Sequence, residues 1–470
     1  MFWTHRTLSD VLSRNERRVG AVPSYRRLLH EYPTGARRRL LLAVVVLALF
    51  ISAFEGQLAP VLPLLLADLG LSLEVYGLIT AVSLLFGAVS GYLGGELVDR
   101  IGRVRVLVPF MFLSAAACLF MALSQTVVHF TAARILLAFV EGVAMAGTQP
   151  LIRDFTPRMG RAQAFAFWSW GPVGANFFAA AVAALTLDLF DNSWRAQIFV
   201  MSGLAFVGAT VVALTLRDLA PNLRRTIRLT EHATRGSGAA PAGQRLRLLL
   251  RRRVVWAHVA AMSLLYVLLA TMNAYGQTML VDHFAVAVRT ASAIVMSFWV
   301  SNLAASLVFA RLSDRAQNRK PFLVFGALAA TLLLGALVVT MGAGASASLP
   351  LVVVLLTGVG LSLGAVLGPW MASFSEYTEE VHPDAQGVAF GLNHFVSRLF
   401  ILAAVLFAPQ VVAVGDWRVW MTVTLVTTAA FAVVVTQVQG RLRRAPGSAS
   451  AEEAGAAVAA TGAPEDSRSS

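Results

Sequence analysis

A charged, glycine-containing stretch at the end of an apolar segment decides how the rest of the sequence is interpreted. It reads Gly95-Glu96-Leu97-Val98-Asp99-Arg100-Ile101-Gly102-Arg103-Val104-Arg105. A related stretch occurs later and reads Ala310-Arg311-Leu312-Ser313-Asp314-Arg315-Ala316-Gln317-Asn318-Arg319-Lys320. Each version places a small residue four positions before an Asp-Arg pair and ends on basic residues. The chain therefore contains an internal repeat.

Apolar segments account for most of the chain. Hydrophobic residues make up 57% and charged residues 13%, which excludes a water-soluble globular protein because soluble domains are about one-quarter charged. A membrane helix needs about 20 apolar residues, and this window predicts two sets of six spans. They lie at roughly 40–66, 74–96, 105–123, 127–150, 162–187 and 196–216, then 254–281, 290–312, 321–341, 349–374, 385–413 and 417–438. We therefore predict an all-α integral membrane protein with twelve transmembrane helices in two pseudo-symmetric six-helix bundles.

These spans predict five regions. They are a basic N-terminal segment (1–39), an N-terminal bundle (40–216), a basic linker (217–253), a C-terminal bundle (254–438) and a tail (439–470). The linker is rich in arginine and contains glycine and proline, which is typical of a solvated connection. The tail consists mostly of alanine, serine, glycine and glutamate, and we expect it to be disordered.

The distribution of positive charge predicts the orientation of the spans. The chain has 38 Lys and Arg against 25 Asp and Glu, a net charge of +13, and all but five of the basic residues lie on one side of the predicted spans. Lys and Arg flank the cytoplasmic ends of membrane helices. We therefore expect a multi-pass protein of a bacterial cytoplasmic (inner) membrane with both termini in the cytoplasm. The charge then needs no nucleic-acid partner, and the lipid bilayer is the expected partner.

The quoted stretch has the pattern Gly-x-x-x-Asp-Arg-x-Gly-Arg-x-Arg between the second and third of twelve predicted helices, and it resembles the signature of the major facilitator superfamily. The resemblance implies two six-helix bundles that rock about a central cavity, a small-molecule substrate, a transporter that is not an enzyme, and a monomer. It also implies that both copies form a cytoplasmic gate. The gate residues would be Gly95, Asp99, Arg100, Gly102, Arg103, Asp314 and Arg315.

Two interpretations of this motif remain open. The arginines alone are explained by topology, since they keep the loop in the cytoplasm. Topology does not explain the aspartate that both copies contain. An aspartate there can pair with the positive end of a neighbouring helix. The second copy departs from the pattern, because Ala310 replaces the glycine and an extra residue precedes Arg319.

Glycines at helical spacing predict close contacts between helices. The residues concerned are Gly87, Gly91 and Gly95 in one span and Gly360, Gly364 and Gly368 in another. Small residues at this spacing let two helix backbones approach closely. Static helix packing is the favoured interpretation.

Five ionisable residues lie inside predicted spans, where such residues are costly and usually functional. They are Glu55, Arg134, Glu141, His394 and Arg398. Arg134 and Glu141 are two helical turns apart and share a face, as do His394 and Arg398. Pro60 and Pro63 follow Glu55 and predict a bend in the first helix. Asn273 and Gln277 also share a face, and their amides need polar partners in a membrane.

Each of these residues has a structural alternative. Arg134 can extend its charge to the lipid headgroups, and Arg398 can form a buried pair with an acid on another helix. His394 can be a hydrogen-bonded interior residue, and both glutamates can stay protonated. Arg134 resembles an arginine that the superfamily often carries in its fourth helix, and together with Glu141-Gly142 it resembles the organic-anion branch.

These residues predict a proton-coupled symporter of a small organic anion. Arginines bind carboxylate or phosphate groups in a bidentate manner, and a carboxyl group beside an arginine can link proton and solute binding. The chain has one cysteine, so no cysteine-based metal site can form. It has no phosphate-binding loop, which disfavours primary pumping. We expect no cofactor and a proton as the coupling ion. The alternatives are a proton-coupled exporter of drugs or metabolites and, less favoured, a membrane-embedded sensor or enzyme.

Overall fold

The computed structural model describes residues 28–156, 164, 167–168, 170–224, 226, 247–316, 318–381 and 386–438. The predicted tail, most of the predicted linker and most of the predicted N-terminal segment lie outside these residues. Within them, eleven helices are long and apolar enough to cross a membrane. A shorter apolar helix, Trp170–Thr186, occupies the predicted fifth span.

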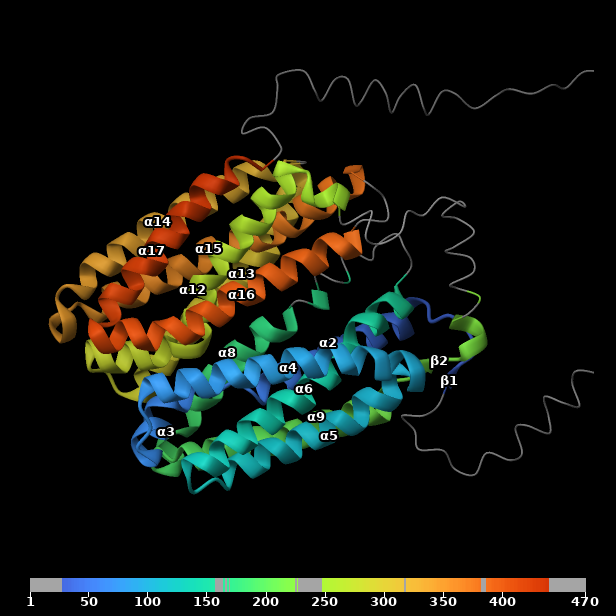
Figure 1. The fold of residues 1–470 in the computed structure, drawn as a ribbon, viewed down its shortest axis with the longest axis horizontal. Coiled ribbons are helices and arrows are strands. Elements are labelled where there is room, and N and C mark those ends of the chain that lie inside the picture. Colours follow the sequence, from blue (N-terminus) through green and yellow to red (C-terminus); the bar gives the residue numbers. More distant parts are fainter. Residues whose placement is uncertain are drawn as a thin grey trace, which may run out of the picture.

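Helices form both halves of the molecule (Figure 1). The first half contains α2 (Gly35–Phe54), η2 (Ala59–Val61), α3 (Leu62–Leu69), α4 (Leu73–Ile101), α5 (Arg103–Ala122), α6 (Val127–Phe155), α8 (Trp170–Thr186), η3 (Asp188–Phe190) and α9 (Trp194–Thr215). The second contains α12 (Arg253–Phe284), α13 (Val288–Ala316), α14 (Lys320–Met341), η4 (Gly344–Ser346), α15 (Leu349–Val381), α16 (Gln386–Val414) and α17 (Trp417–Val435). The predicted all-α, two-bundle architecture is confirmed.

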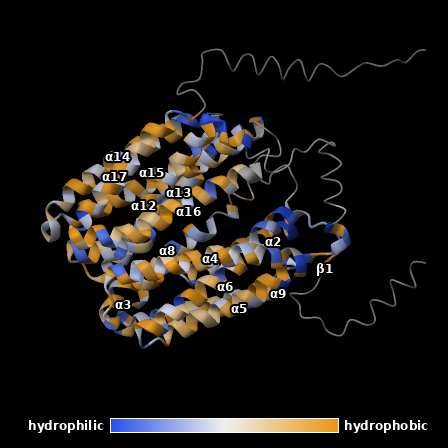
Figure 2. Ribbon diagram, in the orientation of Figure 1, coloured by the Kyte–Doolittle hydropathy of each residue, from blue (hydrophilic) through white to orange (hydrophobic). Residues whose placement is uncertain are grey.

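The helices expose apolar side chains along their lengths. Tyr92 is 81% exposed and Val414 is 93% exposed. Figure 2 shows hydrophobic residues along the helices and hydrophilic residues gathered near the helix ends. Apolar surface of this extent would cause aggregation in water but is compatible with the hydrocarbon core of a membrane.

The two ends of the bundles differ in sequence chemistry. At the end called here the arginine-rich end, α4, α6 and α13 finish and α5 and α14 begin. At the other end, called the opposite end, α4, α6, α9 and α17 begin at side-chain caps. The capping residues there are Ser72, Thr126, Ser193 and Asp416, each accepting a hydrogen bond from a backbone N–H three residues later. Such caps satisfy backbone donors that a helix start leaves free.

A short parallel pair of strands lies at the arginine-rich end. Strand β1 (Leu28–Leu29) precedes α2, and strand β2 (Asp218–Leu219) follows α9. Leu29 and Leu219 are buried against the core of the first bundle. The segments before and after this bundle are thus joined to each other.

The packing glycines lie within bundles, between α4 and α6 and between α13 and α15. A Cβ atom on Gly360 would be 2.3 Å from the carbonyl oxygen of Phe298, and one on Gly364 would be 2.1 Å from that of Asn302. Gly87 and Gly368 are also tight, at 3.1 Å and 3.0 Å from their nearest neighbours, while Gly91 has an ordinary contact at 3.5 Å. A Cβ atom on Gly95 would meet no atom within 4 Å, so close packing does not require glycine there.

The bundles meet at the opposite end. Helix α13 contacts α8, α16 contacts α4, and α12 contacts η2 and α3. Figure 1 shows the two bundles converging near α3 and diverging toward β1 and β2. The ring contact of Tyr76 with Tyr275, the hydrogen bond from Arg289 to Ala184 and the ion pair of Arg289 with Asp188 join the bundles at this end.

Candidate functional site

The first membrane-spanning segment is broken in its middle. Helix α2 ends at Phe54 and η2 begins at Ala59, so the predicted bend is a break, and it lies before the prolines. Pro60 explains its position. Proline has no N–H, and in a continuous helix its ring would clash with the carbonyl four residues earlier, which is that of Gly56. The Gly56 carbonyl therefore lacks its usual helical donor, and it accepts the N–H of Leu58 at 3.1 Å.

Arg134 on α6 supplies a donor to this carbonyl. Its Nη1 donates a hydrogen bond to the oxygen of Gly56 at 3.1 Å. The side chain is therefore directed at the helix break and not at the lipid headgroups. Discontinuous helices of this kind often form ion and substrate sites, because they expose backbone groups inside the membrane.

Two carboxyl groups lie beside the break. Glu55 is fully buried, and neither of its carboxyl oxygens has a hydrogen-bond partner. Glu141 on α6 has one buried oxygen, Oε1, without a partner. A Cβ atom on Gly56 would lie 3.1 Å from this oxygen, so glycine is needed for the approach. The two carboxyl groups are close enough to interact electrostatically.

One cation faces these two acids. The charge of Arg134 acts on Glu141, yet no ion pair joins Arg134 to either acid in the part of the chain that the structure describes. Its buried Nε has no partner. We call Glu55, Arg134 and Glu141 the acid–arginine cluster. Sequence analysis selected all three residues, and the structure brings them together.

The candidates in the second bundle form a looser arrangement. His394 and Arg398 are exposed on one face of α16, and the charge of Arg398 acts on His394 and on Tyr266 of α12. No ion pair to Arg398 is found among the described residues. Asn273 is half-buried, and Gln277 is 2% exposed with its Oε1 unpartnered. Within the described chain, no hydrogen bond joins these amides to His394 or Arg398.

Both copies of the gate motif hold buried or partly buried ion pairs. In the first, Nε of Arg103 lies 3.1 Å from Oδ2 of Asp154 at the end of α6. Arg224 extends this network by contacting both Asp154, at 3.5 Å, and Asp218 of β2. Arg100 pairs with Glu96 one turn earlier. The side chain of Asp99 lies outside the described residues.

Gly102 connects α4 to α5 and has a φ of +119°, a value that L side chains rarely adopt. In the second copy of the motif, Arg319 pairs with Asp314 and with Glu376 on α15, the latter at 3.0 Å. Arg315 is exposed. Asp154 and Glu376 therefore hold equivalent places at the ends of the fourth helix of each bundle, and sequence analysis missed both.

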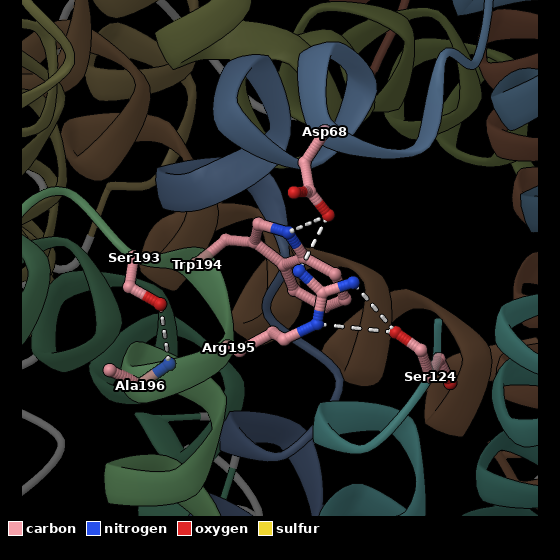
Figure 3. A network of polar contacts seen from close by, with 6 residues as sticks. All are labelled: Asp68, Ser124, Ser193, Trp194, Arg195 and Ala196. Carbon is pink, nitrogen blue, oxygen red and sulfur yellow. Dashed lines mark hydrogen bonds and ion pairs between the residues drawn. The ribbon is translucent and has the colours of Figure 1, made fainter. Parts of the chain in front are cut away.

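A second polar network, also missed, joins α3, α9 and the segment that follows α5 at the opposite end (Figure 3). Oδ2 of Asp68 accepts hydrogen bonds from Nε1 of Trp194 at 3.0 Å and from Nη1 of Arg195 at 2.6 Å. Arg195 also donates twice to the carbonyl oxygen of Ser124. Its guanidinium lies 4.5 Å from the centre of the Trp194 ring, within range of a cation–π contact.

The second bundle contains an equivalent set of Trp and Arg contacts. Nε1 of Trp417 donates to Asp282 at 3.1 Å, and Arg418 donates to the carbonyl of Val338 at 3.2 Å. The sequence does carry a signal for it, because a Trp-Arg dipeptide opens both the sixth and the twelfth spans. It is a further mark of the duplication.

His258 on α12 is a buried histidine that sequence analysis did not select. It is fully buried, and neither ring nitrogen has a hydrogen-bond partner. Its ring lies 5.2 Å from that of Phe374, 6.1 Å from Trp370 and 6.2 Å from Tyr377. No spacing pattern distinguishes it from an ordinary interior residue.

The family is shown by comparison with known proteins. The model of the Major Facilitator Superfamily matches residues 40–405, and the chain belongs to this superfamily. It is accordingly a multi-pass membrane transporter and not an enzyme. The predicted family is confirmed.

Curated relatives match only part of the chain. A putative metabolite transport protein, YyaJ of Bacillus subtilis, is 29% identical over 158 residues, which cover 33% of this chain and 35% of that protein. The multidrug resistance protein MdtG of Klebsiella pneumoniae is 26% identical over 187 residues, covering 38% and 44%. The matched stretch thus spans less than half of each relative.

Solved structures share the fold over nearly the whole chain. A bacterial homologue of the human lysosomal transporter Spinster, inward-facing and occupied, has a TM-score of 0.67 at 14% identity, covering 88% of this chain and 100% of that one. A D-xylose–proton symporter has a TM-score of 0.63 at 16% identity, covering 86% and 98%. At these identities the likeness concerns the fold alone.

Proposed function

We propose that the protein is a proton-coupled symporter of a small organic anion and that the acid–arginine cluster is its proton site. The observation that carries the proposal is the fully buried Glu55 carboxyl group, without a donor among the described residues, beside Glu141, whose buried Oε1 also has none, and one arginine. An ionised carboxylate in a dry site needs donors or a paired cation, and leaving it without them is costly. Protonated carboxyl groups fit these surroundings, since Arg134 donates to Gly56 instead.

Loss of a proton would change the contacts of Arg134. A carboxylate on Glu141 attracts the guanidinium more strongly than a backbone carbonyl does, because charge-assisted bonds are about twice as strong as neutral ones. Protonation of Glu141 and the position of the Arg134 side chain are then linked. An anionic solute that competes for the same cation would be linked to the proton as well.

The second bundle supplies the other anion-binding side chain. Arg398 is exposed without an ion-pair partner among the described residues, and it lies on the same face as His394. A guanidinium offers five donors in a fixed geometry that suits carboxylate and phosphate groups. Asn273 and Gln277 would contribute neutral polar contacts. The solute itself is assigned only to this chemical class.

The described conformation has its bundles in contact at the opposite end, and most basic residues of the described segments lie at the other end. Because basic residues favour the cytoplasm, the arginine-rich end is the cytoplasmic one in this proposal. Both termini are then cytoplasmic, the membrane is the bacterial inner membrane, and the conformation is inward-facing. We take the transporter to act as a monomer without a cofactor.

A second candidate is a proton-coupled exporter of metabolites or drugs. The names of the partial relatives favour it, and so does the acidic pair, which would suit a cationic substrate. Arg398 argues against it, because its positive charge would repel a cation bound nearby.

Thermal unfolding of the purified protein against a panel of organic acids, sugars, amines and cationic dyes separates the two candidates. A ligand at 100 times its Kd stabilises by about 2.7 kcal/mol. We expect an organic acid to stabilise the wild type and the control Arg311→Gln, an exposed arginine, but not Arg398→Gln. Stabilisation by dyes that is lost in Glu141→Gln would support the exporter and overturn the anion proposal.

A further inference from the structure

The turn that leads into α12, at the arginine-rich end, exposes apolar side chains on both sides of a buried one. Leu249 is fully buried in the hydrophobic core, whereas its neighbours Leu248 and Leu250 are each 38% exposed. The backbone N–H of Arg252 donates to the carbonyl oxygen of Leu249 at 3.0 Å, which closes a tight turn before the helix. Because Leu249 is anchored in the core, the two exposed leucines are held at the surface of the second bundle.

Trp256 lies one turn into α12 and is fixed to the same turn. It is 42% exposed and is the most exposed tryptophan among the described residues. Its indole N–H donates to the carbonyl oxygen of Leu250 at 2.9 Å, so the ring is directed back toward the start of the helix. An exposed tryptophan ring whose N–H is hydrogen-bonded is typical of the region between lipid headgroups and acyl chains.

Three arginines lie between the leucines and this tryptophan. Arg251, Arg252 and Arg253 are all exposed, and within the described segments no ion pair joins them to an acid. Helix α12 has no acidic residue in its first turn and no side-chain cap. Positive charge at the start of a helix opposes the helix dipole, so the triplet does not stabilise α12. An anion from outside the chain would offset this charge.

The first bundle contains the same triplet without the tryptophan. Arginines at 37–39 open α2 as those at 251–253 open α12, and Leu42, which is half-buried, stands in the place of Trp256. Positive charge at this end orients membrane helices in general, and both bundles have it. The exposed ring beside the charge is present in the second bundle alone, so the two triplets are a built-in comparison of charge with and without an interfacial ring.

We propose that the turn before α12 is a docking surface for the headgroups of anionic phospholipids. We call it the lipid-docking turn, and it consists of Leu248, Leu250, Arg251, Arg252, Arg253 and Trp256. Guanidinium groups bind phosphate through paired N–H donors, while the ring and the two leucines enter the layer below the headgroups. A phospholipid offers phosphate and acyl chain side by side, whereas free phosphate has no apolar part. The inference does not depend on the transported solute or on proton coupling.

Quenching of tryptophan emission by brominated lipids tests the docking. The full-length protein is reconstituted in vesicles with equal amounts of phosphatidylglycerol, which is anionic, and phosphatidylcholine, which is zwitterionic. Bromine is carried by the acyl chains of one lipid or of the other. The emission of Trp256 is the difference between the wild type and Trp256→Phe. We expect brominated phosphatidylglycerol to quench this emission more strongly than brominated phosphatidylcholine. Equal quenching by the two lipids would overturn the proposal.

Replacing the arginine triplet at 251–253 by glutamine should abolish the preference for phosphatidylglycerol. The matched control replaces the arginines at 37–39 by glutamine, which removes the same charge from the same end of the other bundle, and it should keep the preference. Each variant is compared with the same variant carrying Trp256→Phe. A preference that survives loss of the triplet at 251–253 contradicts the docking surface. Loss of the preference in both variants also contradicts it, because general attraction to positive charge would then explain the result.

Salt provides a second measurement that needs no substitution in the triplet. The Debye length falls from about 8 Å at 0.15 M to about 3 Å at 1 M salt, so we expect the preference for phosphatidylglycerol to decrease as sodium chloride is added. Inorganic phosphate added at constant ionic strength should leave the preference unchanged. A preference that persists at 1 M salt would exclude the arginines as its source. Loss of the preference to inorganic phosphate would show that the surface binds the free anion and not the lipid.

Discussion

Arg134 donates a hydrogen bond to the carbonyl oxygen of Gly56, 78 positions away in sequence, at 3.1 Å. This carbonyl lacks its usual helical donor because Pro60 has no N–H, and the N–H of Leu58 also donates to it at 3.1 Å. The second bundle shows the same device, where Pro409 frees the carbonyl of Val405 for Tyr275. In each bundle a proline removes one backbone donor, and a side chain from another helix donates to the carbonyl concerned.

Replacing Arg134 by methionine should destabilise the protein. The half-buried Gly56 carbonyl would lose its charged donor and keep only the N–H of Leu58, and a hydrogen bond to a charged group contributes about 1.5–3 kcal/mol. Thermal unfolding of Arg134→Met in detergent tests this, with Arg134→Lys as the variant that keeps a cation. Equal stability of Arg134→Met and the wild type would mean that water or another group satisfies the carbonyl.

Asp154→Asn should be much more destabilising than Glu376→Gln, although the two acids hold equivalent places. The Asp154 side chain is 13% exposed and contacts two largely buried arginines, whereas Glu376 is 53% exposed. Breaking a buried pair costs about 3–5 kcal/mol, and an exposed pair contributes about 0–1 kcal/mol. Unfolding midpoints of the two variants give the comparison, and a larger effect at Glu376 would contradict it.

Asp68→Asn should lower stability more than Asp282→Asn. Asp68 accepts from both Trp194 and Arg195, while Asp282 accepts from Trp417. Hydrogen bonds to charged groups contribute about 1.5–3 kcal/mol each when well formed. Because Asp68 is partly exposed, we expect the two variants to differ in unfolding free energy by the lower value of this range. The same unfolding assay measures it. An equal loss in both variants would show that the contact with Arg195 adds nothing.

His258→Phe should leave stability unchanged or raise it. Both ring nitrogens are buried without partners, so removing them removes a desolvation cost, and phenylalanine suits the aromatic surroundings. Unfolding temperature is the readout. A drop of several degrees would reveal a hydrogen bond to the ring that forms in another conformation.

Most of the fold could be predicted because the membrane imposes strong constraints on sequence. The predicted span at 127–150 corresponds to Val127–Phe155, and the predicted span at 321–341 to Lys320–Met341. Helices extend beyond the predicted ends where polar residues continue them outside the apolar region. Hydropathy detects the membrane crossing, not the end of the helix.

The candidate site was only partly predictable. Glu55, Arg134 and Glu141 stand out because charge is rare in apolar helices. The ion-paired residues at the arginine-rich end do not stand out in the sequence, because they lie in polar segments where charge is common. Their pairing depends on three-dimensional contacts, and they are Asp154, Asp218 and Arg224. Gly77 of α4, which lies against Tyr275 and Pro409 of the second bundle, could not be distinguished from other helix glycines by sequence.

The central claim is that the buried acids hold protons in this conformation. Infrared spectroscopy of the purified protein at neutral pH tests it directly, since a protonated carboxyl group has a C=O stretching band distinct from that of a carboxylate. We predict such a band in the wild type and in the control Glu380→Gln, an exposed acid, with loss of intensity in Glu55→Gln and in Glu141→Gln. A wild-type spectrum without the band, or one unchanged in both variants, would contradict the account.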